Sequence, residues 1–160
     1  MSLSTAIEQY GDTKLLHYLQ EEIENHGTRK EEGPNKLIQM MKWHDPDINI
    51  DIQCTSLQLA LSYQKSKKVI YKMIDIGGKQ LAMMKDEIGN TTLHYACKEK
   101  NISMEIISKL LEMGGKELLM MNDCNGNTAL HNACQNENAS MEIISKLFEI
   151  GERGLLMKKG

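Results

Sequence analysis

Two pairs of histidine and cysteine are the residues of this sequence whose types and spacing best suit chemistry. Each has the form His-x-x-Cys: His94 with Cys97, and His131 with Cys134, 37 residues further along. Imidazole nitrogens and thiolate sulfurs are ligands that zinc prefers, and four of them complete a tetrahedral site. The spacing therefore makes a zinc site the first hypothesis to weigh.

The histidines also fit a structural role at the start of a helix. A capping box places Ser or Thr at the N-cap and Glu or Gln three residues later, so that the two side chains satisfy unpaired backbone N–H groups. One Thr-x-x-Gln sequence of this kind is present, and each of the two histidines also stands three residues after a threonine. The predicted caps are Thr55 with Gln58, Thr91 with His94, and Thr128 with His131.

The positions of the pairs argue against a shared metal. Packed helix axes lie about 8–10 Å apart, whereas zinc lies about 2.0–2.3 Å from each ligand. The matching positions one unit earlier are Gln58 and Leu61, which cannot repeat the ligand set. We therefore expect no metal site, and we interpret Cys97 and Cys134 as small buried hydrophobic residues.

Catalytic signatures are missing from the sequence. It contains no G-x-S-x-G, H-E-x-x-H or Walker-type glycine loop. The acidic pairs Glu21-Glu22 and Glu31-Glu32 lie in polar stretches typical of solvated surface. The sequence therefore predicts neither an enzyme nor a bound cofactor.

The composition argues against further classes of protein. The 160 residues carry 19 Lys and Arg against 22 Asp and Glu, which lacks the basic excess of proteins that bind nucleic acids or anionic membranes. The longest apolar runs, such as 118–121, fall far short of the roughly 20 residues of a membrane span. Four cysteines without a recognisable secretory signal indicate reduced thiols, so we expect an intracellular, cytoplasmic location.

An internal duplication organises the chain. Residues 89–121 and 126–158 are identical at 21 of 33 aligned positions, at a shift of 37. Residues 55–60 match 91–96 more weakly, and Leu16-His17-Tyr18 echoes Leu93-His94-Tyr95. Such periods indicate stacked repeats.

Each unit contains signals for two helices. The first is predicted to begin at Thr91 and to run to about Lys100, and the second to cover Met104–Met113 after Ser103 as N-cap. Gly114 suits the left-handed residue that ends a helix. The apolar positions of the second helix cover more than one narrow stripe, so it needs neighbours on two sides.

The turn before the first helix carries a family signature. Residues 86–96 read Asp-x-x-Gly-x-Thr-x-Leu-His-x-Ala, and residues 123–133 repeat this pattern. It resembles the ankyrin repeat, whose unit starts D-x-x-G-x-T-P-L-H-x-A. The resemblance implies an all-α solenoid of stacked helix-turn-helix units with β-turn fingers. It implies a single domain over 1–160, with units near 10–46, 47–85, 86–122 and 123–160, the first of them divergent.

The units depart from the family in length. The ankyrin period is about 33 residues, so the period of 37 adds four residues, two between the helices and two after the second helix. Both insertions fall in connections, where extra length costs little.

The resemblance implies a non-catalytic module that binds a protein partner on the concave face of the fingers and first helices. Units three and four support this because they differ at 87/124, 88/125, 98/135 and 99/136, while the core positions agree. We also expect Cys124, at a finger tip, to be exposed. The predicted partner-binding residues are Ile52, Gln53, Ser62, Tyr63, Glu87, Ile88, Asn90, Lys98, Glu99, Cys124, Asn125, Asn127, Gln135 and Asn136.

Three alternatives stay open. The chain could be a structural spacer or a regulatory segment of a larger multidomain protein such as an enzyme. A methionine-rich binding groove would follow if Met84 and Met121 were exposed. The last helix is nearly as apolar as the internal one, which predicts either a longer natural protein or self-association through the uncapped C-terminal repeat.

Overall fold

The computed structural model describes residues 2–26, 41–45, 50–101 and 103–157. The elements follow in the order α1 (Leu3–Gln9), α2 (Asp12–His26), β1 (Met41–Asp45), β2 (Ile50–Cys54), α4 (Ser56–Ser62), α5 (Lys67–Met83), α6 (Thr92–Lys98), α7 (Met104–Leu119), α8 (Ala129–Gln135) and α9 (Met141–Met157). Across these ranges, none of the helices has the length and hydropathy needed to cross a membrane. The structure is mainly helical, which confirms the predicted fold class.

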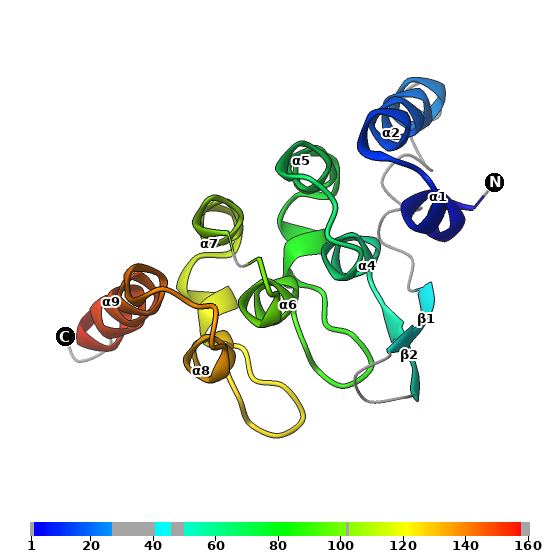
Figure 1. Ribbon diagram of the computed structural model, residues 1–160. Coiled ribbons are helices and arrows are strands. Elements are labelled where there is room, and N and C mark those ends of the chain that lie inside the picture. Colours follow the sequence, from blue (N-terminus) through cyan, green and yellow to red (C-terminus); the bar gives the residue numbers. More distant parts are fainter. Residues whose placement is uncertain (1, 27–40, 46–49, 102, 158–160) are drawn as a thin grey trace.

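The helices form two rows (Figure 1). Short helices α1, α4, α6 and α8 contact one another in turn, and the longer helices α2, α5, α7 and α9 do the same beside them. Each short helix also packs against the long helix that follows it. Loops project from the side of the short helices, one before α6 and one before α8. This stacking of helix pairs is the predicted solenoid.

The short helices α4, α6 and α8 begin at capped threonines. Thr55, Thr91 and Thr128 have extended backbone, and each forms a capping box with the residue three positions later. The residue after each helix start is a leucine, of which Leu57 and Leu93 are completely buried. Capping and burial together explain how helices of seven residues persist, since isolated helices of that length are unstable in water.

Helix α7 continues past Gly114, the residue predicted to end it, and α5 likewise continues past Gly78. The left-handed residues are Gly78, with φ 61°, and Gly115, with φ 59°, rather than Gly114, and a further helical turn follows each kink. Gly114 lies inside the helix, where a Cβ would approach the Leu118 side chain to 2.5 Å. The extra turn of α7 buries Leu118 and Leu119, so it accounts for the two added residues that follow the second helix.

The first helix pair begins earlier than the unit 10–46. Helix α1 starts at Leu3 and packs on α4, and α2 packs on α5, so residues 3–9 belong with this pair. The echo of Leu93-His94-Tyr95 at Leu16-His17-Tyr18 is wrong as a structural match. His17 lies within α2, exposed and 3.1 Å from Glu21, instead of at a helix start.

A hairpin replaces a simple turn before α4. Strands β1 and β2 pair antiparallel, with Met41 opposite Cys54 and Asp45 opposite Ile50. The segments 27–40 and 46–49, which include part of the predicted first unit, lie outside the described residues.

Thin apolar layers hold the rows together. Ile70, Met73 and Ile74 of α5 and Ile107 and Leu110 of α7 are completely buried between the helices. The methionine-rich groove required exposed side chains at 84 and 121, but both are half-buried and pack against the core. The methionines at these two positions therefore serve packing.

Candidate protein-binding surface

The fingers 86–90 and 123–127 are built alike. Asp86 Oδ1 accepts backbone N–H groups of Ile88 (3.0 Å) and Asn90 (2.8 Å), and Asp123 Oδ1 accepts the corresponding pair, both at 2.9 Å. Burial acts to raise the pKa of Asp123, but the bonds from the backbone of Asn127 and Asn125 outweigh it and lower that pKa. Each finger is therefore a turn held by the carboxylate oxygen of one aspartate.

Neighbouring fingers are joined through their backbones. The N–H of Glu87 donates to the carbonyl of Gln53 at 2.9 Å, and the N–H of Cys124 donates to the carbonyl of Ile88 at 3.0 Å. Gly89, with φ 87°, permits this approach because a Cβ there would lie 3.0 Å from the nitrogen of Cys124. The finger tips thus form one connected strip.

The side chains three residues after the capping threonines of α4 and α6 link these two helices to the next finger. Gln58 Nε2 donates to the carbonyl of Asn90 at 2.8 Å, and His94 Nε2 lies 2.9 Å from the carbonyl of Asn127. Because the Thr91 N–H donates to Nδ1 of His94 at 3.1 Å, the proton of the neutral ring must be on Nε2, which donates to Asn127. Burial lowers the pKa of His94, which favours this neutral form.

His131 repeats the cap without the link. The Thr128 N–H donates to its Nδ1 at 3.0 Å, yet the ring is exposed. Cys134, interpreted from the sequence as buried, is also exposed, whereas Cys97 is buried and its pKa is raised to about 12 by burial. The interpretation of Cys134 was wrong because no further helix pair covers this side of α8 within the described residues. Nowhere in the described chain do three His, Cys, Asp or Glu side chains gather as metal ligands would.

Two of the predicted partner-binding residues are buried. Ile52 and Asn90 are each 2% exposed. Ile52 lies on strand β2 opposite Trp43. The Asn90 amide lies 3.4 Å from Asp86 Oδ2, and its oxygen accepts from Lys98 Nζ at 3.3 Å. Neither side chain presents a contact surface, which corrects the prediction for both.

The other predicted residues differ in exposure. The exposed ones are Gln53, Tyr63, Glu87, Lys98, Cys124, Asn125 and Gln135, and the half-buried ones are Ser62, Ile88, Glu99, Asn127 and Asn136. Asn136 also has a packing role, because its Nδ2 donates to the carbonyls of Cys97 and Glu99, both at 2.9 Å. Its amide fastens α8 to the end of α6.

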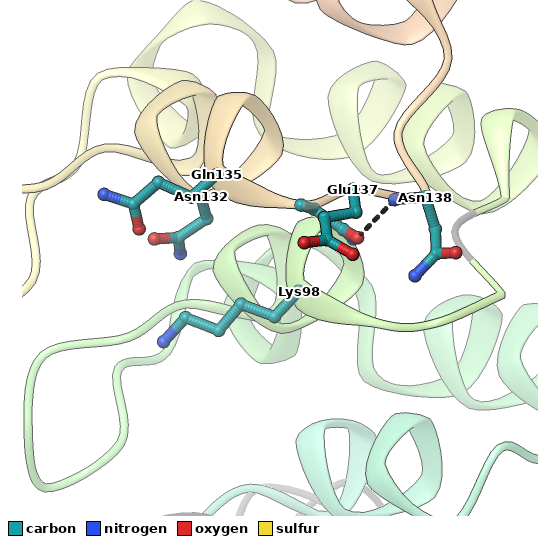
Figure 2. A pocket seen from close by; sticks show the side chains of 6 residues that line it. Lys98, Asn132, Gln135, Glu137 and Asn138 are labelled. Carbon is teal, nitrogen blue, oxygen red and sulfur yellow. Dashed lines mark hydrogen bonds between the residues drawn. The ribbon is translucent and has the colours of Figure 1, made fainter.

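An open groove brings three of these residues together (Figure 2). It has a volume of about 450 Å³ and runs between α6, α8 and the loop after α8. Its lining residues are Lys98, Asn132, Gln135, Asn136, Glu137 and Asn138. Sequence reasoning missed Asn132, Glu137 and Asn138. The first two replace Tyr95 and Lys100 of the preceding unit, so the comparison of units contained a signal for them.

Comparisons with known proteins agree with this architecture. A search of curated proteins finds no match. The crystal structure of the ankyrin repeat domain of Bcl-3, described as a unique member of the IkappaB protein family, matches with a TM-score of 0.60 and 24% sequence identity. The alignment covers 94% of this chain and 57% of the Bcl-3 chain, so this protein spans little more than half of that domain. The family described as "Ankyrin repeats (3 copies)" matches residues 57–154, which is more than half of the sequence. The chain therefore belongs to the ankyrin repeat family.

Proposed function

We propose that this protein is a non-catalytic module that binds a protein partner on its finger face, the surface formed by the fingers 86–90 and 123–127 and by α4, α6 and α8. Ankyrin repeats generally serve protein–protein interaction. Intracellular location and the absence of catalysis stay predictions, supported by the cysteine content and the missing catalytic motifs.

The groove between α6 and α8 is the observation that carries the proposal. Four of its positions, 98/135, 99/136, 95/132 and 100/137, are among the 12 that differ between residues 89–121 and 126–158. Scaffold residues agree because packing constrains them, so variation along the groove is expected where contacts select a partner.

The chemistry of the groove favours an extended polar segment of a partner protein. Gln135 and Asn138 carry exposed amides, each of which donates and accepts hydrogen bonds as a peptide group does. Asn132 lies beneath them, buried, and its amide donates to the carbonyl of His94. Lys98 and Glu137 add one charge of each sign. The bonds between fingers and helices hold this surface in place before binding, which reduces the entropy lost on association.

A variant of Gln135 tests the proposal against a matched control. Gln135 and Gln80 are both exposed glutamines on helices, the first in the groove and the second on α5. With immobilised protein and a lysate of the source cells, Gln135→Arg should reduce capture of a specific partner at least about tenfold, a loss of about 1.4 kcal/mol. Gln80→Arg should capture as the wild type does.

The alternative, a spacer or regulatory segment of a larger protein, gives a different result. The captured set would then be the same for wild type, Gln135→Arg and Gln80→Arg. That outcome would reject the groove as the binding surface.

A further inference from the structure

The finger 123–127 contains the only Asn-Gly pair of the sequence, Asn125-Gly126. Asparagine is a thermolabile residue, because the backbone nitrogen of the next residue attacks its side-chain carbonyl carbon. A glycine in that place has no side chain to hinder the attack and leaves the backbone free to turn. The equivalent pair in the finger 86–90 is Ile88-Gly89, which carries no amide to attack. The chemistry therefore distinguishes one finger from the other.

Both residues of the pair are exposed, and the space around them is open. The backbone N–H of Asn125 donates to Asp123 Oδ1 at 2.9 Å, while its side-chain amide has no hydrogen-bond partner among the described residues. A Cβ at Gly126 would meet nothing within 4 Å, whereas one at Gly89 would lie 3.0 Å from the nitrogen of Cys124. The Asn125 side chain is therefore free to rotate towards the peptide bond that follows it.

The turn restrains the nitrogen that would attack. The N–H of Gly126 donates to the carbonyl of Asp123 at 3.0 Å, and this bond must open before the nitrogen can reach the side chain. Backbone bonds tie the finger 86–90 to strand β2 on one side and to the next finger on the other. Within the described residues, the finger 123–127 is tied to a neighbouring finger on one side only. Segments held by fewer bonds open locally at a lower free energy, so this finger opens more readily.

We propose that Asn125 is a site of spontaneous deamidation, at a rate set by the opening of its finger. The nitrogen of Gly126 bonds to Cγ of Asn125 and gives up its proton, and the side-chain nitrogen leaves as ammonia, so that a cyclic succinimide forms. Water then adds to one of the two ring carbonyls and breaks its bond to the ring nitrogen, which yields aspartate or isoaspartate. One water is consumed for each ammonia released, and no oxidant or reductant takes part.

Either product alters the finger. Aspartate at position 125 adds a carboxylate close to that of Asp123. Isoaspartate adds one carbon to the backbone before Gly126 and so displaces Asn127, whose carbonyl accepts from the Asp123 N–H and from His94 Nε2, both at 2.9 Å. Isoaspartate therefore weakens the link between α6 and this finger. The modification does not depend on the proposed function of the groove.

Peptide mass spectrometry of the full chain, sampled during incubation at neutral pH, tests the proposal. The tryptic peptide 117–146 contains six asparagines, so five of them are controls within the same molecule; they stand at 122, 125, 127, 132, 136 and 138. The mass gain of OH over NH₂ should appear at Asn125 at least about tenfold faster than at any other, a difference of about 1.4 kcal/mol in activation free energy. Electron-transfer fragmentation should identify isoaspartate beside aspartate at this position.

Variants separate the chemistry of the pair from the opening of the finger. Asn125→Gln should abolish the modification at position 125, because attack on the longer side chain must close a larger ring, whereas Asn122→Gln should leave the rate at Asn125 unchanged. His94→Ala removes the bond to the Asn127 carbonyl and should raise that rate severalfold, while His131→Ala should not change it.

The wild type unfolded in urea keeps the test valid if His94→Ala fails to fold, as judged by circular dichroism. Its finger bonds are broken, so Asn125 should react faster than in the folded chain. A rate at Asn125 no higher than at the other asparagines of the peptide, or a rate that is the same in the folded and the unfolded chain, would each overturn the proposal.

Discussion

Units three and four of this protein share most of their sequence and differ in what covers them. In unit three, Leu93 and His94 are completely buried and Cys97 is buried. Their equivalents in unit four are Leu130, which is half-buried, and His131 and Cys134, which are exposed. The same residues in the same local structure therefore have different surroundings, because α8 and α9 cover only the earlier pair.

The difference between the two units separates local from tertiary contributions to stability. Both units form a finger on an aspartate and a capping box on a threonine, which need only residues close in sequence. Only unit three adds a bond from its histidine to the next finger. Paired substitutions at equivalent positions thus measure what a neighbouring repeat adds.

Truncating Leu93 or its equivalent Leu130 should give the largest difference in stability between the two units. Leu93→Ala removes a fully buried side chain and leaves a cavity between helix pairs, so it should lower the free energy of unfolding by about 3 kcal/mol. Leu130→Ala, at a half-buried site, should cost about 1 kcal/mol. Urea unfolding followed by circular dichroism measures both. Equal losses would show that the end of the stack is as well packed as its middle.

Removing the imidazole of His94 or of His131 should give the next largest difference in stability between the two units. His94→Ala leaves the Thr91 N–H and the Asn127 carbonyl without their partner in a buried site and should cost about 2 kcal/mol. His131→Ala loses only an exposed cap and should cost about 0.5 kcal/mol. The same unfolding experiment applies. His94→Gln is the control, since Gln58 makes both bonds in unit two. A loss as large for His131→Ala would assign the effect to the cap alone.

Substitutions of the residues before Leu93 and Leu130 should change stability less, and these changes should be stabilising. The Thr92 hydroxyl is buried and has no hydrogen-bond partner among the described residues. Thr92→Pro removes that hydroxyl and places proline at the first position of α6, where its fixed φ is favourable. It should raise the free energy of unfolding by about 1 kcal/mol, and Ala129→Pro, which removes no hydroxyl, by about 0.5 kcal/mol. Thermal unfolding checks the ranking, and a destabilised Thr92→Pro protein would contradict it.

Much of the fold could be predicted because its signals are local or repeated. The Thr-x-x-Gln and Thr-x-x-His sequences stand where α4, α6 and α8 begin, and the spacing of 37 residues indicated the stack. Helix α1 was missed because seven residues carry too weak a pattern, and the burial of Leu3, Ala6 and Ile7 accompanies packing on α4.

The candidate surface was harder to predict because exposure depends on neighbours. Asn90 and Asn127 occupy the same place in the finger, yet Asn90 is buried and Asn127 is half-buried. Asn138 equals Asn101 in sequence and lines the groove only through the path of the loop after α8. No spacing rule contains that information.

The dependence of stability on pH isolates the link between unit three and the next finger. Burial depresses the pKa of His94 in the folded state, while the unfolded state keeps a value near 6.5. Below that value the unfolded chain binds more protons, so this contribution to stability is complete above pH 6.5 and is lost as pH falls towards the folded pKa. Protonation would also place a hydrogen on Nδ1, facing the Thr91 N–H, and disrupt the cap.

The difference in pH dependence between the wild type and His94→Gln measures the contribution of His94 to stability directly. From pH 7.5 to pH 5, His94→Gln should lose less stability than the wild type, because glutamine makes the same bonds without titrating. Urea unfolding at each pH gives the comparison, with the lowered pKa of Asp123 contributing only at more acidic values. If the profile of His94→Gln ran parallel to that of the wild type, the His94 ring would not be the group that couples stability to pH, and the link to the next finger would not depend on its neutral form.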